Sequence, residues 1–204
     1  YYSVIAELDG RIVGSNFLDE RSAIVAIGPV SVDPSLQNKS IGRQLMQRVL
    51  DRIAEKSFPG ARLVTEAYHN RSFSLYAKLG FETREPLAIM QGTPIAKDIP
   101  GFAVRRATKD DLDSCNQLSL KVHGHDRSGQ LLDAIKEGTA TVVEHDGHIS
   151  GYATAIAFFG HAVGETNNDL KALIGSATEY LGPGFILPTR NADLLRWCLA
   201  GGLR

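Results

Sequence analysis

The chain has 204 residues, of which 43% are hydrophobic and 22% are charged, and its formal net charge at pH 7 is −1. These proportions are typical of a globular protein and exclude a disordered, collagen-like or coiled-coil chain. The near-zero net charge gives no overall attraction to nucleic acid or to an anionic membrane, so any phosphate site must be local.

Cysteine usage and apolar runs indicate a cytoplasmic protein. Cys115 and Cys198 are far apart and form no CxxC motif, so we interpret them as reduced structural thiols. No apolar run reaches the ~18 residues that a membrane span needs. The first residues, YYSVIAELDG, lack the basic segment of a signal peptide. We therefore expect localisation in the cytoplasm, with neither membrane nor nucleic acid as a partner.

Residues 4–14, VIAELDGRIVG, predict a β-hairpin. Asp9 and Gly10 lie between two alternating apolar segments, and both central residues of a two-residue hairpin turn must tolerate positive φ. A strand follows over residues 22–32, SAIVAIGPVSV. Because proline cannot donate a ladder hydrogen bond, Gly28-Pro29 predicts a break in the pairing of this strand.

A polar loop then leads into an amphipathic helix. Asp33-Pro34 predicts a turn at the start of the loop. The helix is indicated by apolar residues at helical spacing, namely Ile41, Leu45, Met46, Val49, Leu50 and Ile53. At such a junction, unpaired N–H groups and the positive end of the helix dipole point into the loop. Lys39 and Arg43 add positive charge, and Gly42 permits close backbone approach. A diphosphate fits this chemistry, although a strand, loop and helix with a glycine are common in themselves.

The segment that begins at residue 61 predicts a short strand that leads to Asn70, with Glu66 on its stretch LVTEA, and then a helix. A further strand is expected within residues 82–92. The segment 92–101, GTPIAKDIPG, contains two prolines and two glycines and is interpreted as a linker. This places the domain boundary near residue 95 and predicts two domains, 1–95 and 96–204.

The second half of the chain repeats the first. TVVEHDGHISG at 141–151 is similar to residues 4–14, and residues 184–204 are similar to 61–82. Two matching pairs in the same order indicate two copies of one unit. The second copy opens with a strand and two helices before its Asp-Gly turn, whereas only the first continues beyond its last helix. We therefore expect the first copy to lack its N-terminal strand and helices, the second to lack a C-terminal strand, and the whole protein to extend past both ends.

A group of histidines in the second copy raises a metal hypothesis. His123, His125 and Asp126 are close in sequence, but Gly124 and Ser128-Gly129 indicate a loop, and no further ligands follow at a zinc-like spacing. We interpret the cluster as a polar loop and expect no metal site.

The first copy resembles the GNAT superfamily of acetyl-CoA-dependent N-acetyltransferases. Its loop, Gln37-x-x-Ser40-x-Gly42, is similar to the family signature Gln/Arg-x-x-Gly-x-Gly/Ala. Its later helix carries Asn70, Tyr76 and the closing Gly80-Phe81 at the family's places. The resemblance covers about residues 4 to 90, and the second copy looks like a degenerate unit. It implies an α/β fold of two tandem units, each a mixed, mostly antiparallel twisted sheet flanked by helices.

The resemblance implies acetyl-CoA as co-substrate, without a metal, and assigns residues to it. Backbone groups of the broken strand would bind the pantetheine arm, loop amides would hold the diphosphate, and an asparagine would contact the cofactor from the other side. These residues are Val30, Ser31 and Val32; Gln37, Asn38, Lys39, Ser40, Ile41, Gly42 and Arg43; and Asn70. Ser40 departs from the family glycine, and a positive φ there would cost ~1 kcal/mol.

The resemblance also suggests catalytic residues. Tyr76 lies where the family keeps a general acid that protonates the departing thiolate, and packing on the sheet is its alternative role. The broken strand offers no carboxylate as a general base, so Glu66 is a weak candidate, and Tyr68 and His69 are weaker ones. A backbone N–H near Val30 would hold the oxyanion.

Two functions follow from the resemblance. The first is transfer of an acetyl group from acetyl-CoA to the primary amine of a small molecule or peptide by direct attack in a ternary complex, in a monomer or homodimer. The second is a non-catalytic acetyl-CoA-binding or interaction module. A second acetyl-CoA site is not expected, because Glu165 brings negative charge to the corresponding place, where Thr166 and Asp169 predict a helix cap.

Overall fold

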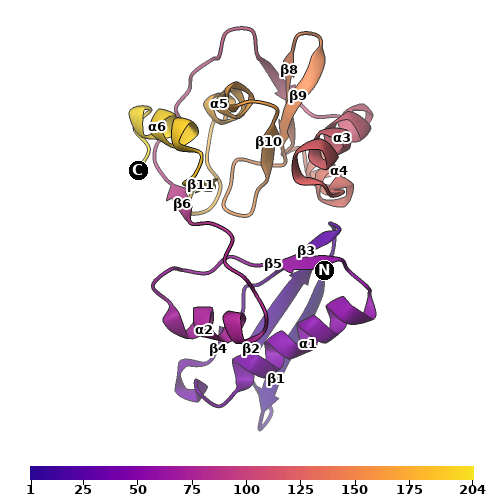
Figure 1. Ribbon diagram of the computed structural model, residues 1–204, viewed down its shortest axis with the longest axis vertical. Helices are drawn as coiled ribbons and strands as arrows, with labels where there is room; N and C mark the ends of the chain where they lie inside the picture. Colours follow the sequence, from indigo (N-terminus) through magenta and orange to yellow (C-terminus); the bar gives the residue numbers. More distant parts are fainter. The chain divides into compact units, whose positions relative to one another are not determined.

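The computed structural model describes residues 1–204 and divides into two compact units, residues 1–83 and 84–204. The secondary structure of both units is labelled in Figure 1. The boundary corrects the one expected near residue 95. Its physical reason is the segment β6 (Leu87–Met90), which pairs antiparallel with β11 (Phe185–Pro188) and buries Met90 in the core of the second unit.

The first unit is a mixed sheet with helices on one face. Its elements are β1 (Tyr2–Leu8), β2 (Arg11–Asp19), β3 (Ile24–Ile27), β4 (Ser31–Val32), α1 (Ile41–Glu55), β5 (Gly60–Arg62) and α2 (Asn70–Lys78). The strand order is β1-β2-β3-β5, with β4 also paired to β2. Only the β3–β5 pairing is parallel. Side chains of α1 and α2 pack on Leu18, Val25 and Ile27 from the sheet.

The broken strand expected over residues 22–32 is present. It forms β3 and β4, which are separated by Gly28-Pro29. The short strand expected before Asn70 is β5, which ends at Arg62 and does not include the stretch LVTEA that carries Glu66. Residues of β5 pair only with Ile24 to Ala26, and the partner strand breaks soon afterwards. The chain beyond Arg62 therefore has no strand to pair with.

The second unit has helices on both faces of its sheet. Its remaining elements are β7 (Ala103–Arg106), α3 (Leu112–His123), α4 (Ser128–Glu137), β8 (Thr141–His145), β9 (His148–Ala153), β10 (Ala162–Gly164), α5 (Asn167–Ser176) and α6 (Ala192–Ala200). The four-stranded sheet has the order β10-β9-β8-β7 and is antiparallel. Helices α3 and α4 pack against one face, around Val142 and Tyr152. Helix α5 covers the other face, around Val143 and Ala153.

The two Asp-Gly hairpins have the same internal geometry. Asp9 and Gly10 have φ of +52° and +76°, and Asp146 and Gly147 have φ of +49° and +77°. Each hairpin also carries one register shift at the same distance from its turn, between Ala6 and Glu7 in the first and between Val143 and Glu144 in the second. The turn chemistry predicted from the sequence is thus confirmed in both units.

Candidate active site

The candidate site of the first unit begins at the open edge of β4. Asp33 N donates to Val13 O, so these two residues form a hydrogen-bonded pair between β4 and β2. Hydrogen-bonded pairs alternate along an antiparallel ladder, so Ser31 and Ser15 form the next one. Ser31 therefore turns its backbone groups toward β2, whereas those of Val32 point away from it. Since β4 pairs only with β2, the groups of Val32 face an edge with no strand. This corrects the expectation for Ser31, whose backbone groups are taken up by the ladder.

A glycine brings β4 close to β2 and α1. A Cβ atom at Gly14 would lie 2.8 Å from Ser31 O and 3.0 Å from a methyl carbon of Leu45. Asn16, two residues along β2, is fully buried, and its Nδ2 donates to Leu45 O at 3.4 Å. These contacts fix the start of α1 against the edge of the sheet.

The loop between β4 and α1 is held at its entry by Asp33. Its Oδ1 accepts hydrogen bonds from Ser35 N at 2.9 Å and Ser35 Oγ at 2.6 Å, and its Oδ2 pairs with Arg11. These hydrogen bonds with Ser35, followed by the charge of Arg11, lower the pKa of the Asp33 carboxyl. The predicted Asp33-Pro34 turn is a short 3₁₀ helix over Pro34–Leu36.

The loop ends in a left-handed residue directly before the helix. Ser40 has φ +62° and ψ +8°, and Asn38 also has a positive φ of +69°. A left-handed residue next to a right-handed one turns consecutive N–H groups to the same side, which is the geometry of anion-binding concavities. Ser40, which stands at the place of the first glycine of the loop signature, therefore adopts the left-handed conformation that favours glycine.

The N-terminus of α1 has no internal cap. The side chain of Ser40 makes no capping hydrogen bond, and the first turn of α1 contains no acidic residue. The hydrogen bond that begins the helix runs from Gln44 N to Ser40 O. The N–H groups of Ile41, Gly42 and Arg43 are thus the orphan donors of the helix. Lys39 and Arg43 are both exposed beside them.

Gly42 is not required by the packing of the protein. A Cβ atom there would meet Val32 and Leu75 at 3.6 and 3.8 Å, which are ordinary van der Waals distances, and its φ is not in the left-handed region. The glycine therefore leaves open space at the helix start without relieving an internal clash.

Arg71 is a site residue that sequence reasoning missed. It lies in the first turn of α2, and its Nη1 donates to Oε1 of Gln37 in the loop. The hydrogen bond joins two segments that are far apart in sequence, and only the position of Arg71 directly after Asn70 hinted at it. Asn70 is the first residue of α2 and is exposed, while the N-cap is His69, whose Nδ1 accepts from Ser72 N at 3.4 Å.

Tyr76 lies on the inner side of α2. Its half-buried ring packs on the core of the unit and meets Phe81 edge-on, with ring centroids 6.2 Å apart. Burial raises the pKa of the Tyr76 phenol, and a hydrogen bond with Ser72 acts in the opposite direction. The phenol is therefore protonated at neutral pH, as a proton donor has to be.

The candidate bases are all exposed. Glu66 was expected on a strand but lies in the segment after β5, where Glu66 O accepts from His69 N at 3.0 Å. Tyr68 is 80% exposed, and His69 caps α2. All three side chains are therefore open to solvent.

The corresponding region of the second unit differs in two respects. Eight residues separate β4 from α1, namely 33–40, but only Glu165 and Thr166 separate β10 from α5. The N-terminus of α5 is closed by the predicted capping box, in which Asp169 accepts from Thr166 N at 2.7 Å. Glu165 pairs with Lys121 at 2.7 Å and with His148 at 3.3 Å. The ammonium group of Lys121 therefore balances its charge. The connection before α5 is too short for a loop like that before α1, and the N-terminus of α5 is already capped.

The histidines of the second unit contact one another. The Nε2 atoms of His123 and His161 form a hydrogen bond of 3.1 Å. The ring centroids of His123 and His125 are 6.1 Å apart. No group of three or more His, Cys, Asp or Glu side chains is placed to hold a metal ion.

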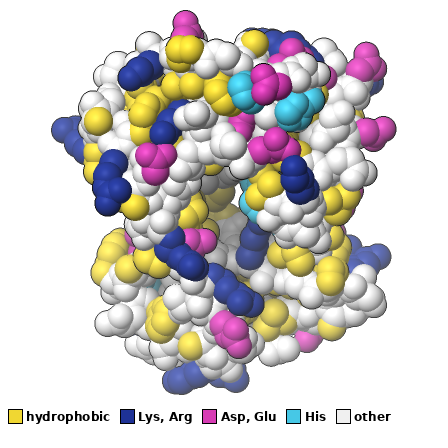
Figure 2. Space-filling view, turned by 45° about the horizontal axis from the view of Figure 1, so that its top comes forward, with side chains coloured by type: hydrophobic (Ala, Val, Ile, Leu, Met, Phe, Trp, Pro, Cys, Tyr) yellow, Lys and Arg dark blue, Asp and Glu magenta, His cyan; other side chains and the backbone are white.

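No helix has both the length and the apolar character of a membrane span. Acidic and basic side chains are interspersed on the face shown in Figure 2.

Comparison with known proteins gives a family for the first unit. Residues 1–83 match the family model described as an acetyltransferase (GNAT) domain. The first unit is a GNAT acetyltransferase domain. A curated relative, the mycothiol acetyltransferase of Thermomonospora curvata, is 31% identical over 91 residues, which are 44% of this chain and 30% of that protein. The chain thus spans less than a third of this relative.

The fold extends beyond the GNAT domain. A crystal structure described as a "Putative Acetyltransferase" from Pyrococcus horikoshii has a TM-score of 0.76 with this chain at 18% sequence identity. The match covers 99% of this chain and 69% of that one. Both units therefore occur together in a known fold.

Proposed function

We propose that the chain transfers an acetyl group from acetyl-CoA to an amine, with the chemistry in the GNAT domain. The observation that carries the proposal is the uncapped start of α1, where three orphan N–H groups lie beside Lys39 and Arg43 and next to a loop in a left-handed turn. Backbone donors, a helix dipole and two cations suit the diphosphate of coenzyme A.

The remaining contacts to the cofactor follow from the neighbouring elements. The pantetheine arm would lie along the open edge of β4 and bond to the backbone groups of Val32. It would also bond to those of Val30, which lies two residues earlier and so would point to the same side. Gln37, Asn38, Lys39, Ser40, Ile41, Gly42 and Arg43 would surround the phosphates, and Asn70 would approach from α2. The hydrogen bond from Arg71 to Gln37 supports this arrangement because it ties α2 to the loop.

The reaction requires no covalent enzyme intermediate. The amine nitrogen attacks the thioester carbonyl carbon, and the oxyanion that forms is held by a backbone N–H near Val30. The C–S bond then breaks, and the phenol of Tyr76 gives its proton to the leaving thiolate. The amine loses its proton to water or to an exposed base such as Glu66, and the Tyr76 phenolate takes up a proton from solvent. The products are an acetamide and coenzyme A, and the protein returns to its starting state.

The second unit is, in this proposal, a degenerate copy of the GNAT domain. The shared hairpin geometry and the same order of hairpin, strand, helix, strand and helix support a duplication. The closed cap of α5 supports a loss of phosphate binding in that copy. The alternative function of the chain is a non-catalytic acetyl-CoA-binding module. This alternative predicts binding of acetyl-CoA without turnover.

The experiment is an acceptor screen with detection of free thiol. The chain is incubated with acetyl-CoA and a panel of small amines and amino-terminal peptides, and thiol release is compared with a sample that lacks the amine. Amine-dependent release is expected. Stabilisation of the chain by acetyl-CoA in a thermal-shift assay, without release for any amine, would favour the binding module, and no stabilisation would contradict both.

A further inference from the structure

The sheet of the first unit changes register where β3 gives way to β4. β2 pairs Leu18 with Ile27, but it pairs Ser15 with Ser31. Three steps along β2, from 15 to 18, therefore match four steps along the broken strand, from 27 to 31. One extra residue on one strand is the pattern of a β-bulge, and the segment that holds it contains Gly28-Pro29. The break thus interrupts the ladder on the side of β2 that faces β3 and β4.

Asn16 supplies the hydrogen-bond acceptor that the ladder lacks at this break. Gly28 N donates to Phe17 O at 2.9 Å, and a regular antiparallel pair would return a bond from Phe17 N to Gly28 O. Phe17 N instead donates to Oδ1 of Asn16 at 2.8 Å. Because a backbone N–H can only donate, this contact also fixes the orientation of the Asn16 amide and places its Nδ2 on the other side.

The other half of the Asn16 amide holds α1. Its Nδ2 donates to Leu45 O at 3.4 Å and lies 3.5 Å from Met46 Sδ. A backbone carbonyl oxygen has two lone pairs, so Leu45 O can accept this bond without leaving the hydrogen bonding of the helix. Asn16 is fully buried, so its hydrogen bonds are shielded from water. One side chain therefore connects the strand break to the beginning of α1.

The second unit provides a comparison without a break. Counted from the Asp-Gly turn, Thr154 and Ala153 take the places of Phe17 and Asn16. Thr154 N donates to His161 O at 2.8 Å, so it has the backbone acceptor that Phe17 N lacks. The pairing of β9 with β10 shows no register shift. An asparagine thus stands where the ladder is broken, and an alanine stands where it is intact.

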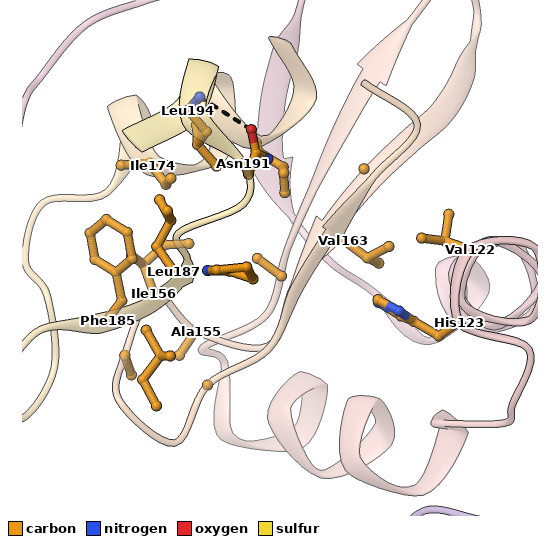
Figure 3. A pocket seen from close by; sticks show the side chains of 17 residues that line it. Val122, His123, Ala155, Ile156, Val163, Ile174, Phe185, Leu187, Asn191 and Leu194 are labelled. Carbon is orange, nitrogen blue, oxygen red and sulfur yellow. Dashed lines mark hydrogen bonds between the residues drawn. The ribbon is translucent and has the colours of Figure 1, made fainter. Parts of the chain in front are cut away.

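The intact ladder of the second unit ends beside a cavity of about 230 Å³ between β10 and β11. Figure 3 shows Val163 of β10 and Leu187 of β11 on opposite sides of this cavity. Ala155, the residue after Thr154, is part of its lining. The strands of the second unit therefore part only beyond a continuous ladder, whereas in the first unit the ladder itself is broken. The need for a side-chain acceptor is specific to the first unit.

We propose that Asn16 is a positioning residue of the cofactor site. Its amide replaces the missing ladder acceptor and holds the beginning of α1, so it fixes the open edge of β4 relative to the orphan N–H groups of the helix. Coenzyme A would span these two places, with its pantetheine arm on the edge and its diphosphate at the helix. A ligand that bridges two places binds best when their separation is set in advance. This inference rests on the function proposed above.

The test compares Asn16→Ala with Val49→Ala in the full chain. Val49 is a fully buried residue of α1 in the same core, so its truncation lowers stability without touching the strand break. We expect Asn16→Ala to raise the Kd for acetyl-CoA about tenfold in a calorimetric titration, because the hydrogen bonds of a buried amide are lost. Val49→Ala should change this Kd by less than about twofold, since the two sites are independent. An equal rise in both variants would overturn the proposal.

Deuterium exchange of the Phe17 amide reports on the hydrogen bond itself. We expect this amide to exchange at least about tenfold faster in Asn16→Ala than in Val49→Ala, and equal rates would overturn the acceptor role of Asn16. Binding of acetyl-CoA by the wild type with an unchanged Kd in Asn16→Ala would overturn the positioning role alone. No binding by the wild type would overturn the proposed function together with it.

Asn16→Asp decides the question if Asn16→Ala does not fold. Its ionised carboxylate can accept from Phe17 N but cannot donate to Leu45 O, whereas the protonated carboxyl can do both. Burial raises the pKa of a carboxyl, so moderately acid solution restores the donor. We expect the ratio of the variant Kd to the wild-type Kd to fall toward unity as the pH is lowered from about 8 to about 5. A ratio that is independent of pH would overturn the proposal.

Discussion

Gln37 and Arg71 join the loop before α1 to the first turn of α2 through a single side-chain hydrogen bond. The two residues come from segments separated by a helix and a strand. In the proposed site, the contact fixes the loop before any cofactor arrives, so that its amides converge without further ordering.

This relationship predicts a coupled effect on cofactor affinity. Gln37→Ala and Arg71→Ala should each raise the Kd for acetyl-CoA by about threefold to tenfold, and the double variant should be little worse than Arg71→Ala, because residues in contact are not additive. Calorimetric titration of the four proteins measures the cycle. Fully additive effects would show that Arg71 acts on the cofactor by itself.

Replacement of Ser40 by glycine should stabilise the first unit. The left-handed conformation of Ser40 costs an L-residue about 1–2 kcal/mol, and part of this gain is lost to the greater freedom of glycine when unfolded. We expect a net increase of about 0.5–1 kcal/mol in the free energy of unfolding measured with urea. A decrease would mean that the serine hydroxyl makes a contact worth more than the backbone strain.

Gly42→Ala should separate stability from binding. The added methyl group finds only ordinary contacts within the protein, and alanine is the better helix former, so stability should be unchanged or higher by about 0.5 kcal/mol. In the proposed site the same methyl group would occupy the space of the diphosphate, so acetyl-CoA affinity should fall at least about tenfold. Gly14→Ala is the contrasting control, because its clash with Ser31 O lowers stability. Undiminished affinity in Gly42→Ala would remove Gly42 from the site.

In the proposed mechanism, Tyr76→Phe should lower turnover about 100-fold without changing the Kd for acetyl-CoA, since only the phenol that would donate the proton is lost. The ring that packs on the core is kept, which makes the variant a fair test of chemistry. Because burial raises the Tyr76 pKa above its ordinary value of 10, the acid form persists at neutral pH, and a loss of rate from its deprotonation is expected only above pH 10. Equal kcat in both proteins would leave Tyr76 with a packing role.

Asp111 should make the stability of the second unit depend on acid pH. Its carboxylate bonds the guanidinium of Arg105 at 2.8 Å and the backbone N–H of Thr108 at 2.7 Å. Arg105, the largest cause, lowers the Asp111 pKa to about 2. The folded-state pKa is depressed, so the contribution is complete above the unfolded pKa near 4 and is lost as pH falls toward 2.

For Asp111 we expect this contribution to be about 1–2 kcal/mol, discounted because Arg105 is partly exposed. Asp111→Asn should flatten the urea-measured stability between pH 4 and pH 2 by this amount. Asp133→Asn, which removes an exposed carboxylate on α4 that pairs with Lys136, is the matched control and should leave the profile nearly unchanged.

Local chemistry explains what the sequence determined about this protein. The two Asp-Gly turns, the break at Gly28-Pro29, the amphipathic α1 and the capping box of α5 depend on neighbouring residues, and each is present where it was expected. The resemblance of the first unit to GNAT domains also depended on such short segments, and the family model matches that unit.

Tertiary structure decided what depends on distant partners. The segment after α2 had the pattern of a strand, but its pairing with β11 assigned it to the second unit and moved the boundary. The contact of Arg71 with Gln37, the parity that turns Ser31 toward β2, and the cavity between β10 and β11 likewise arise from pairing between remote segments. A strand pattern specifies which face is apolar, whereas its neighbour is chosen by the register and packing of the whole sheet.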